Sequence, residues 1–337
     1  MKEYVVGVIG TGRIGKLHIA NLVQLKNVRV KTAADPMADK KELQEWFKTS
    51  GVEHYVKDSN EIIEDSEIDV VFICSSTDTH LDLIEKSVEA GKHVFCEKPI
   101  SFSQEETVAL YDKIKDLDSK VMIGFNRRFD VNFSAIQQTA SDGTLGEPHI
   151  IKITSRDPEA PSAVYSETSG GLFFDMTIHD FDMARFLANS EVTEVYAQGG
   201  ALIDPSIEKY EDIDTAIITL KFENGAHGVI DNSRQAVYGY DQRAEVFGTK
   251  GQANTENETN TRVRISTVDG ISEDKPKWFF LERYDAAFKA EIEYFFEAIE
   301  NNLDISPDYS DGLKAQAIAF AAKKSYQTGK PVKVVYE

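Results

Sequence analysis

The sequence contains only two cysteines, Cys74 and Cys96, and each stands at the end of a short apolar run. Two cysteines at this spacing exclude a disulfide-stabilised scaffold and a CxxC metal site. A thiol at the end of an apolar run is typical of a small buried residue, so we expect both side chains to be buried at strand ends. This cysteine content favours a reducing compartment.

Long apolar runs are absent as well. No segment approaches the roughly 18 consecutive apolar residues that a membrane-spanning helix requires. The first residues, MKEYVVGVIG, lack the length and the charged flank of a signal peptide. We therefore expect a cytoplasmic protein that has no membrane partner.

Basic residues are scarce relative to acidic ones. Lys and Arg number 37 against 57 Asp and Glu, which gives a formal net charge of −20. Such a charge repels the phosphates of nucleic acids and of anionic membranes. We therefore expect neither as a partner and look for a small molecule instead.

The 337 residues exceed the size of one ordinary hydrophobic core, so we expect two domains, at 1–123 and 124–337. In the first, short apolar runs alternate with amphipathic helical patterns, which predicts an α/β domain with a doubly wound parallel sheet. The expected strands are 4–10, 28–35, 67–76, 92–99 and 120–126, and the expected helices are 11–25, 38–51, 79–91 and 105–117.

After residue 126 the pattern changes to long alternating strands, which predicts an α+β domain with an open, mostly antiparallel sheet. The expected strands are 149–157, 191–200, 214–225, 226–235, 242–251 and 261–268. The pair Asn224–Gly225 between two of them indicates a hairpin. One helix is expected over 173–188 and two more over 284–301 and 311–329, the last packing back near the first domain.

A glycine-rich loop, GTGRIG, lies between the first strand and the first helix. In this context Gly10 permits a tight turn, Gly12 lets a pyrophosphate approach the backbone, and Gly15 lets the helix pack on the strand. The phosphates would then meet the N-terminus of the helix, where free N–H groups favour anions. The loop therefore predicts a dinucleotide site.

Asp35 ends the second expected strand, 20 residues after Gly15. A carboxylate there accepts hydrogen bonds from both ribose hydroxyls of NAD and repels the 2′-phosphate of NADP. No arginine follows Asp35 directly, although Lys40 and Lys41 lie nearby. We therefore predict NAD as the cofactor. The alternative is that the glycines only form a turn and that Asp35 only caps the next helix.

Lys98 leaves an apolar strand in the segment VFCEKP. Ligands of open α/β sheets bind beyond the carboxyl ends of the strands, and this is where Lys98 would lie. Pro99 restricts the backbone of Lys98 to extended or turn conformations. Lys98 is therefore a candidate for the site and not an ordinary surface lysine.

Asp175 and His179 are four residues apart and would share one face of the helix expected over 173–188. With Lys98 they form a possible acid–base set, because a histidine titrates near neutrality and can take a hydroxyl proton. The same spacing occurs in metal sites, but no third ligand of obvious spacing is present, so we expect no metal. Asp180 and Asp182 are expected to be helix-surface or capping residues.

Five segments together carry a resemblance to a known family: GTGRIGKLH, Asp35, FCEKP, GFNRRFD and GGLFFDMTIHDFDMARFL. In this order they resemble the glucose–fructose oxidoreductase/inositol dehydrogenase/MocA family over nearly the whole chain. Within the family, SRDP at 155–158 and the segment 232–251 are most similar to inositol 2-dehydrogenases. Some inositol dehydrogenases carry methionine in place of Asn126 and asparagine in place of Asp157, a departure that bears on the substrate.

The resemblance implies roles for particular residues. The catalytic residues would be Lys98, Asp175 and His179. Cofactor contacts would come from Gly10, Thr11, Gly12, Arg13, Ile14, Gly15, Asp35, Ser75, Ser76, Thr77, His80, Glu97 and Lys98. Substrate contacts would come from Lys98, Asn126, Arg127, Asp157, Asp175, His179, Tyr238 and Tyr240. Arg127 could instead pair with acidic surface residues.

The activity implied by the resemblance is the NAD-dependent oxidation of myo-inositol at C2 to 2-keto-myo-inositol, in inositol catabolism, by a homotetramer whose second-domain sheet mediates assembly. Three alternatives stay open, one of them a transferase or hydrolase that uses a trapped NAD and releases no net NADH. The substrate could be another cyclic polyol or sugar, such as scyllo-inositol or glucose. The chain could also be an NAD-binding regulator without turnover, although such a protein has no need of the acid–base set.

Overall fold

A computed structural model describes residues 2–337 of the chain. Contacts between backbone positions divide it into two compact units. The first unit runs to Phe125 and resumes over Phe288–Leu313; the second unit comprises Asn126–Ala287 and Lys314–Glu337. The expected division into folding domains at residue 123 stays a prediction.

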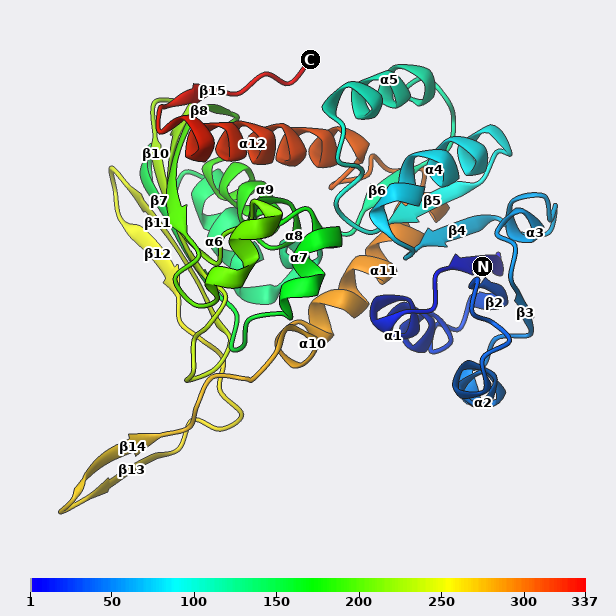
Figure 1. Cartoon of the computed structure of the whole chain (residues 1–337), viewed down its shortest axis with the longest axis horizontal. Coiled ribbons are helices and arrows are strands. Elements are labelled where there is room, and N and C mark those ends of the chain that lie inside the picture. The colour runs from blue at the N-terminus through cyan, green and yellow to red at the C-terminus, as the bar shows by residue number, and fades with distance from the viewer. Residues whose placement is uncertain (1) are drawn as a thin grey trace. The chain divides into compact units, whose positions relative to one another are not determined.

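The first unit contains a six-stranded sheet with the order β3-β2-β1-β4-β5-β6, and all of its strands are parallel. This order and the helices between the strands are those of a Rossmann domain (Figure 1), so the predicted fold class is confirmed. Strand β1 is buried along its whole length, as its continuous apolar run predicts. The elements are β1 (Tyr4–Ile9), α1 (Arg13–Leu22), β2 (Val28–Ala34), α2 (Lys41–Ser50), β3 (His54–Val56), α3 (Asn60–Ile63), β4 (Val70–Ile73), η1 (Thr77–Thr79), α4 (His80–Glu89), β5 (His93–Cys96), α5 (Gln104–Ile114) and β6 (Val121–Ile123).

The second unit contains a seven-stranded sheet with the order β12-β11-β7-β10-β9-β8-β15. All neighbouring strands are antiparallel except β7 and β10, so the expected open, mostly antiparallel sheet is confirmed. The hairpin expected at Asn224–Gly225 joins β9 and β10, and Gly225 has a φ of 86°. The elements are η2 (Asn126–Phe129), α6 (Val131–Ser141), β7 (Pro148–Arg156), α7 (Ala163–Ser169), α8 (Leu172–Asp175), α9 (Thr177–Ala188), β8 (Val192–Gly200), η3 (Pro205–Tyr210), β9 (Thr215–Phe222), β10 (His227–Ser233), β11 (Asp241–Gly248), β12 (Gln252–Thr255), β13 (Arg264–Thr267), β14 (Gly270–Glu273), α10 (Phe280–Arg283) and β15 (Val332–Lys333).

The two long helices expected near the end of the chain are confirmed as α11 (Asp285–Glu300) and α12 (Tyr309–Thr328). Most of α11 belongs to the first unit, and α12 crosses the division after Leu313. No helix within residues 2–337 combines the length and the low polarity that crossing a lipid bilayer demands.

The single helix expected over 173–188 is wrong, because the structure divides it into α8 and α9 at Met176. The Thr177 hydroxyl donates to the carboxamide oxygen of Asn232 at 2.7 Å and lies 3.2 Å from the carbonyl oxygen of Leu172. A threonine hydroxyl bound in this way competes with the helical backbone pattern. Asp175 therefore ends one helix, and His179 lies in the first turn of the next.

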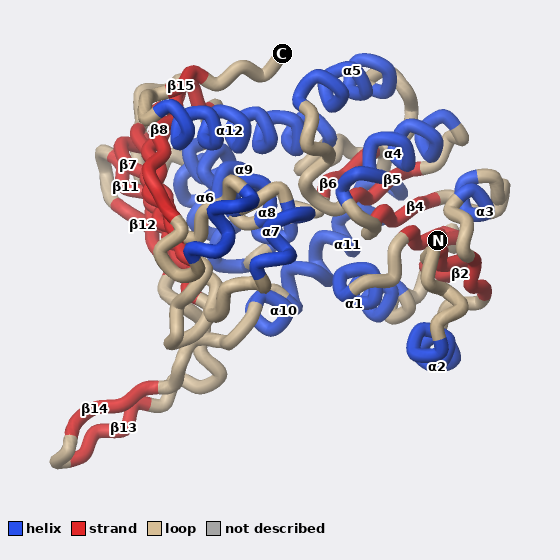
Figure 2. The backbone as a smooth tube through the Cα atoms, viewed as in Figure 1, coloured by secondary structure: helices blue, strands red, loops and turns tan. Residues whose placement is uncertain are grey.

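The strand expected over 261–268 does not join the large sheet. Residues 264–267 form β13, which pairs only with β14 in a separate two-stranded hairpin. Figure 2 shows this hairpin extending away from the seven-stranded sheet, and its residues are exposed on both strands. The alternation of apolar residues in this segment indicated a strand correctly but not its partner.

Candidate active site

The glycine loop adopts the geometry expected of a dinucleotide site. Gly10 has a φ of 91°, which a residue with a side chain rarely adopts. A Cβ on Gly15 would lie 2.0 Å from the carbonyl oxygen of Gly10, so only glycine lets α1 pack this closely on the loop. A Cβ on Gly12 would meet nothing within 4 Å, so the space beside its backbone is open.

Asp35 binds the glycine loop directly. Its carboxylate accepts hydrogen bonds from the backbone N–H of Thr11 at 2.9 Å, from the Thr11 hydroxyl at 2.7 Å and from the N–H of Met37 at 2.9 Å. Burial by itself would raise the pKa of Asp35, but the hydrogen bonds from Thr11 and Met37 outweigh it and hold the pKa below its ordinary value. A charged acceptor is therefore fixed beside the loop.

These features fit NAD. Open space beside Gly12 leaves room for a pyrophosphate, and the ten-residue helix α1 starts at the next residue. Oδ1 of Asp35 accepts only the N–H of Met37, so it retains capacity to accept a further bond, as binding of a ribose hydroxyl requires. Arg13 and Ile14 form the first turn of α1, within the segment assigned to the cofactor.

The segment after β4 contains the other expected cofactor residues. The hydroxyls of Ser75 and Thr79 lie 2.6 Å apart, and Ser76 and Thr77 lead into η1. His80 is almost fully buried. Its Nδ1 lies 2.8 Å from the carbonyl oxygen of Pro99 and its Nε2 lies 3.2 Å from that of Ser75. His80 thus joins the segment after β4 to the segment after β5, and burial lowers its pKa.

Glu97 and Lys98 follow directly after β5, and both are partly exposed. The Lys98–Pro99 peptide bond is cis. The Glu97 carboxylate lies 2.7 Å from Nε2 of His18 on α1, a contact that sequence reasoning missed. A Cβ on Gly124 would approach the Glu97 carboxylate to 3.0 Å, so Gly124 leaves the room that this carboxylate occupies.

In the second unit, Arg234 joins two of the expected substrate residues. It donates to Asp175 at 2.8 Å and to Asp157 at 3.1 Å, and its side chain is 7% exposed. The Tyr165 hydroxyl also donates to Asp175, at 3.0 Å. Burial raises the pKa of Asp157, while Arg234 opposes that rise. The structure therefore brings Asp157 and Asp175 to one cation.

Sequence reasoning missed Arg234, because the pairing of β7 with β10 that places it beside Asp157 was not predicted. Strands β7 and β10 are parallel, and Ser233 lies opposite Arg156 in their register. The next residues along the two strands, Arg234 and Asp157, therefore leave the sheet side by side. Tyr165 was missed as well, because it comes from the separate helix α7.

Arg127 is committed to a buried ion pair. Its Nη1 donates to Asp180 at 2.5 Å, and the side chains of both are almost fully buried. Asn232 donates to the other oxygen of Asp180 at 2.9 Å. Two roles were considered for Arg127. The structure shows that Arg127 pairs with an acidic residue, Asp180, which is buried and not on the surface. Contact between Arg127 and the substrate stays a prediction.

Asp180 and Asp182 are not the surface or capping residues that the sequence suggested. Both are buried, and Asp182 binds Arg128 through two hydrogen bonds, at 2.5 and 2.9 Å. The physical reason is the tight turn η2, which brings Arg127 and Arg128 into the interior, where each needs a carboxylate. Asn126, at the start of the same turn, is also buried.

The two expected tyrosines have different environments. The Tyr238 hydroxyl donates to Asp241 at 2.6 Å and accepts from Arg156 at 3.1 Å, and its side chain remains exposed. Tyr240 is buried, and its ring meets the edge of Tyr284 at a centroid distance of 6.0 Å. Burial raises the pKa of Tyr240 well above its ordinary value, so its hydroxyl stays protonated at neutral pH.

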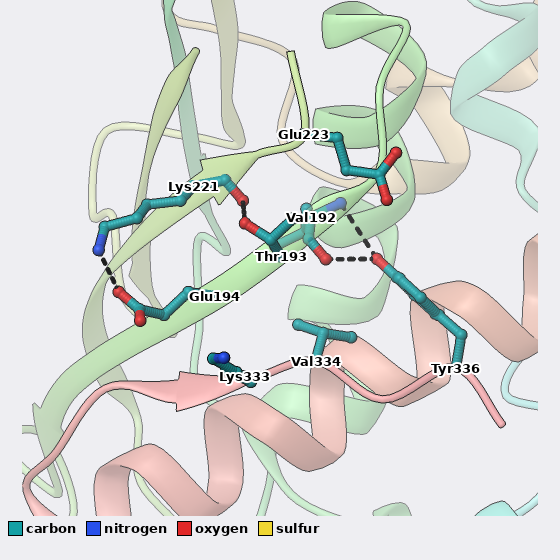
Figure 3. Close-up of a pocket in the computed structure, with 8 residues that line it drawn as sticks. All are labelled: Val192, Thr193, Glu194, Lys221, Glu223, Lys333, Val334 and Tyr336. Carbon is teal, nitrogen blue, oxygen red and sulfur yellow. Dashed lines mark hydrogen bonds and ion pairs between the residues drawn. The ribbon is translucent and has the colours of Figure 1, made fainter. Parts of the chain in front are cut away.

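A pocket of about 350 Å³ lies elsewhere in the second unit, where β15 meets the edge of β8. Figure 3 shows Tyr336 bound to Val192 on one side of it and the Lys221–Glu194 ion pair on another. None of the expected site residues lines it. In the described part of the chain, no group of three or more His, Cys, Asp or Glu side chains is placed to hold a metal ion.

The parallel sheet, its glycine loop and the carboxylate that follows β2 define a dinucleotide-binding protein whose loop fits NAD. Residues 4–125 match an oxidoreductase family with an NAD-binding Rossmann fold, and residues 133–254 match the C-terminal domain of the same GFO/IDH/MocA family. The chain belongs to this family, so both the resemblance seen in the sequence and the NAD cofactor are confirmed.

Several relatives match over nearly their whole length. An uncharacterized oxidoreductase of Bacillus subtilis, YrbE, is 50% identical over 99% of this chain and 97% of its own. The myo-inositol 2-dehydrogenase of Thermotoga maritima is 44% identical over 98% of each chain. The scyllo-inositol dehydrogenase of Lactobacillus casei, solved with NAD(H) and scyllo-inositol, has a TM-score of 0.90 and 31% identity over 99% of each chain.

Proposed function

We propose that this protein is an NAD-dependent inositol 2-dehydrogenase that oxidises myo-inositol at C2 to 2-keto-myo-inositol. The observation that carries the proposal is the pair of carboxylates, Asp157 and Asp175, held by Arg234 in a chain that also has an NAD-binding loop. A polar, hydrogen-bonding set of this kind suits a ligand covered with hydroxyls. The similarity to inositol dehydrogenases over nearly the full length supports the same substrate class.

Bound NAD supplies the acceptor for the hydride that leaves C2. His179 takes the proton of the reacting hydroxyl as a general base. Lys98 stabilises the negative charge that develops on the same oxygen. Asp175 orients His179 and stabilises its cation, and the ion pair with Arg234 fixes the position of Asp175.

Asp157, Asn126, Arg127, Tyr238 and Tyr240 are proposed to contact the other substrate hydroxyls. The proposal is supported for Asp157 by its place beside Arg234, and for Tyr238 by its exposed, hydrogen-bonded hydroxyl. Arg127 and Tyr240 are buried, so they would contact only a hydroxyl that reaches below the protein surface.

The first experiment measures NADH formation from NAD with myo-inositol, scyllo-inositol and glucose in parallel. Rapid formation with myo-inositol and slow formation with the other two supports the proposal. A preference for scyllo-inositol or glucose retains the mechanism and changes the substrate. NAD binding without turnover on any of the three contradicts the proposal and favours an NAD-binding regulator.

We also infer that the protein is a homotetramer assembled through the seven-stranded sheet. Helices α6, α9 and α12 lie on one side of this sheet in Figure 1, and strands on its other face expose Ile150, Ile217 and Phe247. Ile150 and Phe247 lie opposite each other on β7 and β11, and adjacent exposed apolar side chains of this kind favour a protein interface. Light scattering coupled to size-exclusion chromatography tests it: the mass of four chains supports the inference, and the mass of one chain contradicts it.

The proposed location is the cytoplasm. Both cysteines, Cys74 and Cys96, are free thiols in the structure, as expected in a reducing compartment. Fractionation of cells that produce the protein tests this location.

A further inference from the structure

Glu291 is a buried carboxyl group for which the proposed mechanism gives no role. It lies on α11, its side chain is fully buried, and neither carboxyl oxygen has a hydrogen-bond partner in the described structure. A carboxylate in such a place would carry a large desolvation cost, whereas a protonated carboxyl group carries far less. Burial, followed by the charge of Glu97, raises the pKa of Glu291 well above its ordinary value.

The face of α11 that contains Glu291 packs against His18. Phe288, one turn before Glu291, meets the His18 ring at 6.0 Å between centroids. Phe295, one turn after it, meets Phe72 and Phe95 at 6.1 and 6.0 Å, and these two rings also contact His18. Glu291 therefore lies between two side chains that share their packing partners with His18.

The two nitrogens of His18 have unequal surroundings. Nε2 lies 2.7 Å from a carboxylate oxygen of Glu97, whereas Nδ1 is buried and has no partner in the described structure. A carboxylate accepts hydrogen bonds and cannot donate, so Nε2 carries the proton in this contact. In the neutral ring Nδ1 is then an acceptor that needs a donor.

We propose that Glu291 carries a proton and donates it in a hydrogen bond to Nδ1 of His18, directly or through one buried water molecule. The resulting chain runs from the Glu291 hydroxyl through the His18 ring to the carboxylate of Glu97. It fixes the Nε2–H tautomer of His18 and thereby holds the Glu97 carboxylate in place beside Lys98. Glu291 is thus a positioning residue that acts through His18, and its effect on turnover rests on the proposed function.

The chain of contacts accounts for two otherwise unexplained features together. An acid without an acceptor and a ring nitrogen without a donor are each costly when buried. As a pair they satisfy each other, and Gly124 leaves the space in which the Glu97 carboxylate receives the Nε2 proton. No net charge is added to the interior beyond that of Glu97.

The decisive measurement is infrared spectroscopy of the NAD-bound protein at neutral pH. The wild-type spectrum should contain the carbonyl-stretching band of a buried protonated carboxyl group. This band should be lost in Glu291→Gln and retained in Glu293→Gln, which changes an exposed residue on the same helix. A wild-type spectrum in which Glu291→Gln removes no such band overturns the proposal.

Nitrogen NMR of the histidine rings tests the second step, with the His18 signals assigned by their loss in His18→Gln. We expect the Nε2–H tautomer in the wild type and in Glu291→Gln, whose amide N–H can also donate. In Glu291→Leu the Nδ1 shift should change, because its donor is gone. An Nδ1–H tautomer in the wild type, or an unchanged shift in Glu291→Leu, contradicts the proposal.

Turnover gives the third readout. Glu291→Leu should lower kcat/KM for NAD by roughly 10- to 100-fold, the range expected when a hydrogen bond to a charged group is misplaced, and Glu291→Gln should recover most of it. Equal losses in the two variants would indicate a packing role and overturn the positioning role. The two spectroscopic readouts need no turnover, so they separate a failure of this proposal from a failure of the proposed function. If Glu291→Leu does not fold, the infrared comparison of the wild type with Glu291→Gln still decides.

Discussion

Arg234 donates a 2.8 Å hydrogen bond to Asp175 in the second unit, and this ion pair is mostly buried, with the Arg234 side chain 7% and the Asp175 side chain 16% exposed. The same guanidinium binds Asp157 at 3.1 Å. Because a planar guanidinium presents several donors in a fixed fork, it holds two carboxylates at a defined separation, which an ammonium group cannot do. The orientation of the proposed catalytic Asp175 therefore depends on Arg234, a residue that sequence reasoning did not identify.

Replacing Arg234 by Met should impair both activity and stability. Two mostly buried carboxylates would lose their cation, and breaking a buried pair typically costs about 3–5 kcal/mol. We expect kcat/KM for the polyol to fall by roughly 100-fold or more. Arg234→Lys should give an intermediate loss, since it keeps the charge and loses the fork. Activity of Arg234→Met within twofold of the wild type would show that Asp175 needs no such support.

Replacing His179 by Ala tests the proposed base. Turnover should fall by roughly 10²- to 10⁴-fold, the usual contribution of a general base. The matched control is His54→Ala, because His54 is exposed on β3 and has no proposed role. Steady-state kinetics with saturating NAD provide the measurement. Near wild-type turnover in His179→Ala would refute the assignment, provided that His54→Ala is also unaffected.

Asp35 should determine the choice of cofactor. The wild type should prefer NAD to NADP by roughly 100-fold in kcat/KM, because the carboxylate binds the ribose hydroxyls and repels a 2′-phosphate. Asp35→Ser should narrow this preference, chiefly by weakening NAD binding. Asp39→Asn changes an exposed carboxylate four residues away and serves as the control. Comparable efficiency of the wild type with both cofactors would contradict the role of Asp35.

Two glycines of the loop should behave differently when each is replaced by Ala. Gly12→Ala adds a methyl group to open space at a φ of −66°, so the apoprotein should keep its stability while NAD binding weakens. Gly15→Ala places its Cβ 2.0 Å from a backbone oxygen, so the apoprotein itself should be destabilised, by about 1–3 kcal/mol. Thermal unfolding with and without NAD separates the two effects. Equal apoprotein stability in both variants would contradict the close packing of α1 on the loop.

Glu291 should make the stability of the wild type depend on pH. Its pKa is raised in the folded protein, so the folded state binds a proton that the unfolded state releases above about pH 4.3. Stability conferred by this proton is therefore complete at low pH and declines as the pH rises toward the folded pKa, by at most about 1.4 kcal/mol per pH unit. The titratable groups around it are His18 on α1, Cys74 after β4 and Glu97 after β5.

Urea unfolding of the wild type and of Glu291→Gln between pH 5 and 9 provides the measurement for Glu291. The variant has no proton to lose, so its stability relative to the wild type should increase with pH. Any pH dependence that comes from the other groups is shared by both proteins and cancels in the difference. A difference that stays constant over this range would show that Glu291 does not titrate between the two states.

Local sequence determined the architecture of the first unit. The glycine loop, the continuous apolar strands and Gly51 at the end of α2 each depend on residues within a few positions of one another, and each was found as expected. The spacing from Gly15 to Asp35 belongs to the same class of information, because one strand–helix–strand unit spans it. The general layout of the second sheet also followed from its alternating strands and the hairpin at Asn224–Gly225.

Tertiary structure decided what surrounds the candidate site residues. Thr177, the first residue of α9, donates a hydrogen bond to Asn232, 55 residues away. The burial of Asp180 depends on Arg127, 53 residues before it, and the partner of Asp175 is 59 residues after it. Glu291 reaches the surroundings of His18 only because α11 packs on the first unit. Secondary-structure propensity and hydrophobic periodicity act over one helical turn or one strand. The pairing of buried charges depends instead on which distant segments the fold brings together. The sequence alone therefore identified the candidate residues, and the tertiary structure determined their partners.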